Sequence, residues 1–240
     1  MTLKLKPPGR GVRGAMAATP PLGLGLTSER ARAHMVERVR QHGVQDNGVL
    51  AALGAVERHR FVDQALASRA YEDVALPIGH EQTISRPTVV ATMLAAVSAP
   101  LQGDARKRAR VLEIGTGCGW QAAVMARLFG EVYSIERIRG LHEAARKNLA
   151  PLRLGNLRLA FGDGREGLPQ AAPFDAIVIA AAGIEVPDEL MRQMAVGARL
   201  IAPVGAEEQA LHLVERVGHE DWHLTVLEGA RFVPLREGTA

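Results

Sequence analysis

The pattern of apolar and polar positions between Pro87 and Val204 changes regularly between a helical period and unbroken apolar runs. Such runs are typical of parallel strands that are buried on both faces, and the AIVIA after Asp175 is one of them. We therefore expect an α/β fold with a doubly wound, mostly parallel sheet. In chain order the pattern predicts a helix Pro87 to Val97, a strand Arg110 to Ile114, a helix Trp120 to Phe129, a strand Glu131 to Glu136, a helix Arg139 to Leu149, strands Leu157 to Phe161 and Phe174 to Ala180, a helix Asp188 to Met194 and a strand Arg199 to Val204.

Different patterns flank this core. After it, the segments Ala210 to Val217 and Trp222 to Leu235 alternate in the manner of an antiparallel C-terminal strand pair at the sheet edge. Before it, two short helical patterns follow Glu29, the second from Gly48 to Val56. The stretch Arg69 to Pro87 is too polar and interrupted for a core element, so we interpret it as an ordered functional loop.

The chain is expected to form a single domain with an extension. Residues 1–28 are rich in proline and glycine, which sustain neither helix nor strand, so we expect them to be flexible. Residues 29–240 are expected to form one domain. Within it, residues 29–87 form the helical N-terminal part and substrate loop, and residues 88–240 form the cofactor-binding core.

The composition excludes several classes of protein. Of the 240 residues 47% are hydrophobic and 23% charged, as in a globular domain. The longest uncharged apolar stretch, Ala176 to Ile184, is about half of what a membrane-crossing helix needs, so we expect no membrane contact. The lone cysteine, Cys118, cannot form an internal disulfide, which favours a reducing cytoplasm. His80 and Glu81 begin the pattern H-E-x-x-H, but position 84 is isoleucine, and we expect no metal site.

The net charge of +3 is concentrated at the start of the chain. The first 40 residues hold eight basic and two acidic side chains, so the remaining 200 carry a net charge of −3. The dense basic run in residues 106–110 precedes an apolar strand, and we interpret it as a solvated connection rather than a phosphate-binding patch. Because the body is acidic and has few aromatic side chains to stack on bases, we expect no nucleic-acid partner.

A glycine loop follows the strand Arg110 to Ile114. The sequence VLEIGTGCGWQ places Gly115 and Gly117 where a ligand can approach bare backbone and a helix N-terminus. The dinucleotide pattern G-x-G-x-x-G requires glycine where Trp120 stands, and the indole would crowd a pyrophosphate. The spacing G-x-G-x-G with Glu113 before it is typical of methyltransferases that bind S-adenosylmethionine.

Two acids at the next strand ends support a cofactor site. Glu136 ends the second strand, where a carboxylate accepts hydrogen bonds from ribose hydroxyls. Asp163 follows the third strand and is suited to the adenine amino group. The carboxyl ends of parallel strands meet at one sheet edge, so we expect both acids and the glycine loop to bind one molecule of S-adenosylmethionine.

Several specific segments are spread over the chain from about Val36 to Leu235. They are AYEDVALPIGH from Ala70, QTISRP from Gln82, the glycine loop, YSIER from Tyr133, GDG from Gly162, PFDAIVIAAA from Pro173, IEVP from Ile184, PVG from Pro203 and FVPL from Phe232. In these segments the chain resembles the protein-L-isoaspartate O-methyltransferase family. The resemblance implies the fold of S-adenosylmethionine-dependent methyltransferases. It also implies methyl transfer from S-adenosylmethionine to the free carboxylate of L-isoaspartyl residues in damaged proteins, which initiates their repair.

The resemblance also assigns roles to residues. It makes Ser85 the active-site serine, for which a helix cap ahead of Pro87 is the alternative. Two residues that flank the segment Thr83-Ile84-Ser85 differ from the family pattern. Glu81 stands where glycine is usual, and Arg86 stands where glutamine is common in bacterial members. We expect these two differences to affect the reaction rate and the peptide preference. The residues implied to contact S-adenosylmethionine are Thr83, Ile84, Glu113, Gly115, Gly117, Glu136, Asp163 and Gly164.

Two other functions stay open at this point. One is a methyltransferase for another carboxylic acid, and the other is a cofactor-binding module without turnover. As partners we expect proteins or peptides that contain L-isoaspartyl residues, and we expect the chain to act as a monomer.

Overall fold

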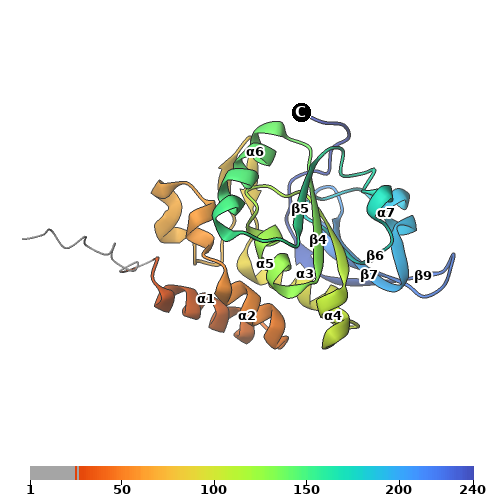
Figure 1. Ribbon diagram of the computed structural model, residues 1–240, viewed down its shortest axis with the longest axis horizontal. Helices are drawn as coiled ribbons and strands as arrows, with labels where there is room; N and C mark the ends of the chain where they lie inside the picture. The colour runs from red at the N-terminus through yellow and green to blue at the C-terminus, as the bar shows by residue number, and fades with distance from the viewer. Residues whose placement is uncertain (1–24, 26) are drawn as a thin grey trace, which may run out of the picture.

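The computed structural model describes residue 25 and residues 27–240 (Figure 1). Most of the predicted flexible extension, residues 1–28, therefore lies outside the described residues. The first helix begins just after Ser28, whose Oγ accepts a hydrogen bond from the backbone N–H of Ala31 at 3.3 Å. This N-cap fixes the start of the helix.

Within the described residues, seven strands form one sheet in the order β5-β4-β3-β6-β7-β8-β9. The first five in this order pair in parallel, and β8 and β9 are added antiparallel at one edge. The predicted doubly wound, mostly parallel sheet with an antiparallel C-terminal pair is thus confirmed. The strands are β3 (Arg110–Ile114), β4 (Glu131–Glu136), β5 (Leu157–Phe161), β6 (Phe174–Ile179), β7 (Met194–Val204), β8 (Gln209–Arg216) and β9 (Trp222–Ala230).

The central strands β3 and β6 are buried on both faces, and their successive residues point to opposite sides of the sheet. In β3, Val111 packs into one hydrophobic cluster and Leu112 into another. The first cluster includes side chains of the helices α1, α2, α3, α5 and α6, and the second includes those of α7, which lies on the other side of the sheet in Figure 1. The helices are α1 (Glu29–Gln41), α2 (Asn47–Ala55), α3 (Pro87–Ser98), α4 (Asp104–Arg108), α5 (Trp120–Leu128), α6 (Arg139–Leu149) and α7 (Asp188–Arg192), with 3-10 helices at Arg58–Phe61, Gln64–Arg69, Ala150–Leu152 and Pro169–Ala171.

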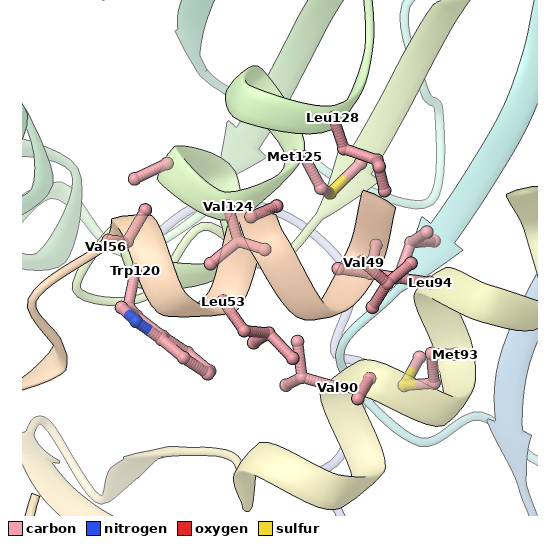
Figure 2. Close-up of a cluster of buried hydrophobic side chains, with 14 of the residues drawn as sticks. Val49, Leu53, Val56, Val90, Met93, Leu94, Trp120, Val124, Met125 and Leu128 are labelled. Carbon is pink, nitrogen blue, oxygen red and sulfur yellow. The ribbon is translucent and has the colours of Figure 1, made fainter. Parts of the chain in front are cut away.

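The N-terminal helices belong to the same core as the sheet. Figure 2 shows α2 between α5 and α3, with Leu53 facing the indole of Trp120 and Val90. The indole is 1% exposed. No helix in residues 27–240 is long and apolar enough to cross a membrane.

Beyond shifts of a single residue, several features differ from the sequence prediction. The strand predicted from Arg199 to Val204 is longer, since β7 begins at Met194. The predicted helix Asp188 to Met194 ends at Arg192, because Met194 already starts β7. The last predicted strand stops at Ala230, since residues 231–235 leave the edge and pair with Ala182 through its backbone. The loop Arg69 to Pro87 contains an antiparallel hairpin, formed by β1 (Leu76–Gly79) and β2 (Gln82–Ile84).

The basic run before β3 is only partly a solvated connection. Arg106 in α4 donates hydrogen bonds to both carboxylate oxygens of Asp46, at 2.8 and 2.6 Å. The two side chains are 12% and 18% exposed. Asp46 is also the N-cap of α2 and accepts from the N–H of Val49. Although burial alone would raise the pKa of Asp46, the hydrogen bonds from Arg106 and the backbone hold it below its usual value.

Replacing Arg106 with alanine should lower the free energy of unfolding by about 1.5–3 kcal/mol at pH 7, the range for hydrogen bonds to a charged group. A lowered carboxyl pKa contributes stability above the unfolded pKa, and this contribution is lost as the pH falls through the folded pKa. The difference between wild type and Arg106→Ala should therefore shrink between pH 7 and pH 3. Urea unfolding across this range measures it.

The matched control is Lys107→Ala, because the Lys107 side chain is 80% exposed and lies 3.9 Å from Asp104. This variant should stay within about 0.5 kcal/mol of wild type. A loss in Arg106→Ala that is equally large at pH 7 and pH 3 would contradict the role of the charge.

Candidate active site

A cavity lies at the carboxyl edge of the parallel strands. Its walls come from the glycine loop after β3, the end of β4, the hairpin β1–β2 and the segment after β9. It is lined by Ile78, Gln82, Thr83, Ile114, Gly115, Gly117, Ile135, Glu136, Arg137, Ile138, Leu141, Gly164, Ala180, Ala181, Val233, Pro234, Leu235 and Arg236. Of the predicted cofactor contacts, this cavity brings together Thr83, Gly115, Gly117, Glu136 and Gly164.

The glycine loop has the backbone that its sequence predicts. Gly115 and Gly117 have φ angles of +91° and +56°, a region that side chains disfavour. A Cβ at position 164 would overlap Cγ2 of Ile114, so only glycine keeps this wall of the cavity open without displacing Ile114. These positions form a cradle of bare backbone against which a flat or extended ligand can lie.

Glu136 is the acid at the centre of the cavity wall. It is 4% exposed, and its two oxygens accept hydrogen bonds from the N–H groups of Gly117 at 2.8 Å and Ile138 at 2.9 Å. A carboxylate has about four acceptor sites, so each oxygen keeps a site for a hydroxyl donor. The carboxylate is thus fixed in position and suited to a vicinal diol.

Asp163 lies at the same edge but is not among the lining residues of this cavity. Its oxygens accept from the N–H groups of Arg165 at 2.8 Å and Gly238 at 2.5 Å. Gly238 belongs to a C-terminal segment that Arg137 also holds, through a 2.8 Å hydrogen bond from Nε to the Gly238 carbonyl. Contact between Asp163 and an adenine amino group therefore stays a prediction.

Glu113 is placed behind the glycine loop. It is fully buried, accepts a hydrogen bond from the Ser134 hydroxyl, and does not line the cavity. Burial raises the pKa of Glu113 to about 8, although the Ser134 hydroxyl acts in the opposite direction. A direct contact between this carboxyl and the cofactor stays a prediction.

The hairpin β1–β2 covers the cavity next to the glycine loop. A Cβ on Gly117 would lie 3.1 Å from Cδ1 of Ile78, so the hairpin and the loop are in close contact. At the tip, His80 and Glu81 have φ angles of +52° and +59°. A two-residue turn with positive φ at both positions favours glycine and asparagine, so a glutamate is strained there.

A second, smaller cavity continues from the first on the inner side of the hairpin. Thr83 lines both cavities, and the second one adds Ile84 and Ser85. Ile84 is buried in the core, whereas Thr83 is exposed and Ser85 half-buried. In the segment Thr83-Ile84-Ser85, the side chain of Ile84 packs into the core, whereas Thr83 and Ser85 face open space.

Ser85 also lines a third space, a groove on the outer side of the loop. The groove has a volume of about 860 Å³ and is lined by Ala75, Thr83, Ser85, Arg86, Val89, Glu207, Glu208, Gln209, Gly229, Ala230, Arg231, Phe232 and Val233. Ser85 thus lies between the inner cavity and a groove large enough for a peptide segment.

The structure rejects the capping alternative for Ser85. The N-cap residue of α3 is Arg86, and its side chain makes no capping hydrogen bond. Asp73 instead accepts from the N–H of Thr88 at 2.9 Å. Within residues 27–240 the hydroxyl of Ser85 makes no side-chain hydrogen bond, so it is free to meet a ligand.

Arg58 fixes the segment that precedes the hairpin β1–β2. It is fully buried, and burial lowers the pKa of its guanidinium to about 10. It donates to the carbonyls of Ala70 and Val74 at 2.8 and 3.2 Å, and its guanidinium lies 4.5 Å from the centre of the Trp120 ring. This contact connects the segment before β1 to the start of α5.

Several lining residues were not predicted. They are mostly apolar and come from the hairpin, from the ends of β3 and β4, from residues 137–141, from residues 180–181 after β6 and from Val233 to Arg236. The segment FVPL after the last strand was a signal that this part of the chain leaves the sheet and lines the cavity. Pro234 cannot donate a hydrogen bond to a neighbouring strand, and the apolar side chains beside it favour burial. No group of three or more histidine, cysteine, aspartate or glutamate side chains in the described part of the chain is placed to hold a metal ion.

Comparison with known proteins gives consistent matches. A family model described as protein-L-isoaspartate(D-aspartate) O-methyltransferase matches residues 30–240. A relative from Burkholderia mallei (strain SAVP1), named protein-L-isoaspartate O-methyltransferase, is 56% identical over 241 residues, which cover 98% of this chain and 73% of the relative. One of the same name from Burkholderia thailandensis is 57% identical over 238 residues, with 96% and 71% covered.

Solved structures agree with this result. A structure titled protein-L-isoaspartate O-methyltransferase has a TM-score of 0.75 and 29% identity, and the match covers 85% of this chain and 65% of the other. A putative protein-L-isoaspartate O-methyltransferase from Plasmodium falciparum, in complex with S-adenosyl-L-homocysteine, has a TM-score of 0.74 over 85% and 98% of the chains. At 22% identity the second structure supports the fold alone.

The strained hairpin tip gives a stability prediction. Glu81→Gly should raise the free energy of unfolding by about 0.5–1 kcal/mol, because glycine adopts positive φ without steric cost and loses part of this gain through its greater freedom when unfolded. Glu81→Ala removes the same charge without relieving the backbone and should bring no such gain. Thermal and urea unfolding of both variants measure the difference, and equal effects of the two substitutions would assign the result to the charge.

Proposed function

The chain belongs to the protein-L-isoaspartate(D-aspartate) O-methyltransferase family, and from this premise we propose that Ser85 positions the acceptor carboxylate while Glu136 and the glycine loop hold the cofactor. Its activity is the transfer of a methyl group from S-adenosylmethionine to the free carboxylate of L-isoaspartyl residues in damaged proteins. The observation that carries the site assignment is the position of Thr83 and Ser85, because these two residues join the cofactor cavity to the outer groove.

The cavity suits S-adenosylmethionine better than a dinucleotide. Glu136 offers one acceptor site on each oxygen, which fits the two ribose hydroxyls. The indole of Trp120 stands where the dinucleotide pattern requires its third glycine, so the loop lacks the close backbone approach that a pyrophosphate needs. The cradle at Gly115 and Gly117 leaves room for the methionine part, and Gly164 leaves room beside Ile114.

The acceptor needs no strong base in this reaction. A carboxylate has an ordinary pKa near 4 and is already ionised at neutral pH. S-adenosylmethionine, when bound, supplies an electrophilic methyl group on its sulfonium. The task of the protein is to align the acceptor with this group, and such alignment can offset about 7–11 kcal/mol of barrier. Ser85 suits this task because its hydroxyl donates one hydrogen bond to a carboxylate oxygen and leaves the other free to react.

The substrates, the oligomeric state and the cellular location of the chain are also proposed. Proteins and peptides that contain L-isoaspartyl residues are its substrates, and the groove beside Ser85 is their proposed place. A monomeric state, the absence of a nucleic-acid partner and a cytoplasmic location are predictions from the charge distribution, the lone Cys118 and the family resemblance.

Methyl transfer to a pair of peptides tests the function. One peptide carries an L-isoaspartyl residue and the other carries L-aspartate at the same place in the same sequence. With tritiated S-adenosylmethionine, we expect label in the first peptide and none above background in the second. A transferase for another carboxylic acid, or a module without turnover, would label neither.

The variant Ser85→Ala separates positioning from structural support. We expect kcat to fall about tenfold to a thousandfold, the range for the loss of one hydrogen bond in the transition state. The affinity for S-adenosylmethionine and the melting temperature should change little. Single-turnover methylation, calorimetry and thermal unfolding of one preparation give the three values, and wild-type turnover in the variant would remove Ser85 from the mechanism.

The variant Glu136→Gln tests the proposed ribose contact. It keeps the size of the side chain but loses the charge and one acceptor, so we expect the affinity for S-adenosylmethionine to fall by about 1.5–3 kcal/mol. Isothermal titration calorimetry measures this. Glu143→Gln is the control, since Glu143 is exposed and lies outside the lining of the cavity, so this variant should keep the wild-type affinity. Unchanged affinity in Glu136→Gln would refute the contact.

A further inference from the structure

Arg86 lies beside the proposed acceptor site without a role in the reaction described so far. It follows Ser85 in the chain, its side chain is 49% exposed, and both residues line the outer groove. The groove carries three more charged side chains, namely Arg231, Glu207 and Glu208. Of the four, Arg86 alone is the immediate neighbour of the serine.

The guanidinium of Arg86 is held in one position. Its Nε and Nη2 donate to Oδ2 of Asp73 at 3.2 and 2.9 Å. Asp73 is itself fixed by the N–H and the hydroxyl of Thr88, at 2.8 to 2.9 Å. Although burial opposes ionisation, these hydrogen bonds hold the pKa of Asp73 below its usual value. Nη1 of Arg86 donates no hydrogen bond to any residue that the structure describes, so it is available to a ligand.

A cation on the reacting carboxylate itself would slow the reaction. Methyl transfer from a sulfonium to a carboxylate consumes one positive and one negative charge. A cation in contact with that carboxylate therefore stabilises the reactants more than the transition state. Asp73 offsets much of the field of Arg86, which reduces this penalty. Arg86 is thus suited to a second anionic group that does not react.

We propose that Arg86 is a specificity-determining residue that binds an acidic side chain next to the isoaspartyl residue of the acceptor. The proposal rests on the proposed function of Ser85. Consecutive residues of an extended peptide are about 3.3–3.6 Å apart, similar to the spacing of Ser85 and Arg86 along this chain. A peptide with its isoaspartyl carboxylate at Ser85 therefore places a neighbouring side chain within reach of the guanidinium.

The first test uses the wild type and two series of isoaspartyl peptides. In one series the residue before the isoaspartyl residue is Glu, Gln or Lys, and in the other series the residue after it is varied in the same way. On one side we expect KM for the Glu peptide to be about three- to fivefold lower than for the Gln peptide, the size of an exposed charge pair. The kcat values should agree within about twofold. The ratio of KM values should fall toward one as salt is added. Equal KM values on both sides, or a preference for Lys as Glu207 and Glu208 would favour, would overturn the proposal.

The second test uses variants. Arg86→Gln should remove the preference between the Glu and Gln peptides, and Arg86→Lys should keep part of it because it keeps the charge. The matched control is Arg69→Gln, since Arg69 also pairs with a carboxylate, that of Glu72 at 3.0 Å, and does not line the groove. A preference that persists in Arg86→Gln would overturn the proposal. So would a uniform loss of kcat together with a lower melting temperature, which indicates a structural role.

The outcomes separate this proposal from the proposed function. If the wild type methylates none of the isoaspartyl peptides, the function fails. If it methylates all of them with equal KM, the function stands and the role of Arg86 fails. The wild-type comparison remains decisive if a variant does not fold.

Discussion

The arrangement of the site depends on the two hydrogen bonds that the carboxylate of Glu136 accepts from the backbone. Glu136 ends β4, and through these hydrogen bonds it fixes both the glycine loop after β3 and the start of α6. Because β3 and β4 are parallel neighbours, their carboxyl ends meet at this point. The same carboxylate that orders the glycine loop has acceptor sites left, which suit the proposed ribose. The structural role and the proposed binding role thus belong to one side chain.

A second carboxylate, that of Asp73, organises the acceptor side. It caps α3 through Thr88, while Ser85 stays out of the capping role. It also holds Arg86 at the edge of the outer groove. The buried guanidinium of Arg58 fixes the segment that carries Asp73, because it binds the carbonyls of Ala70 and Val74. The site is therefore assembled from a rigid sheet edge on one side and a loop fixed by polar contacts on the other.

Much of this arrangement could be predicted from the sequence, for identifiable reasons. Apolar runs along the chain predicted β3, β4 and β5 with their observed bounds, and glycines at strand ends indicated the cradle. The hairpin was missed because its turn uses His80 and Glu81 rather than glycine or asparagine. The ion pair of Arg106 was missed because its partner Asp46 is 60 residues away in sequence. Motif position also could not show that Asp163 and Glu113 lie outside the cavity lining, because this depends on how the C-terminal segment and Ser134 pack against them.

In the proposed mechanism, the methyl donor and the acceptor carboxylate meet at Thr83 and Ser85. A crystal structure of the chain with S-adenosylhomocysteine and an isoaspartyl peptide measures this directly. We expect the ribose hydroxyls on Glu136, the peptide in the groove beside Arg86, and the free isoaspartyl carboxylate facing the sulfur with the hydroxyl of Ser85 as a hydrogen-bond donor. A ribose bound away from Glu136, or an acceptor carboxylate that reaches the sulfur without passing Ser85, would contradict the account.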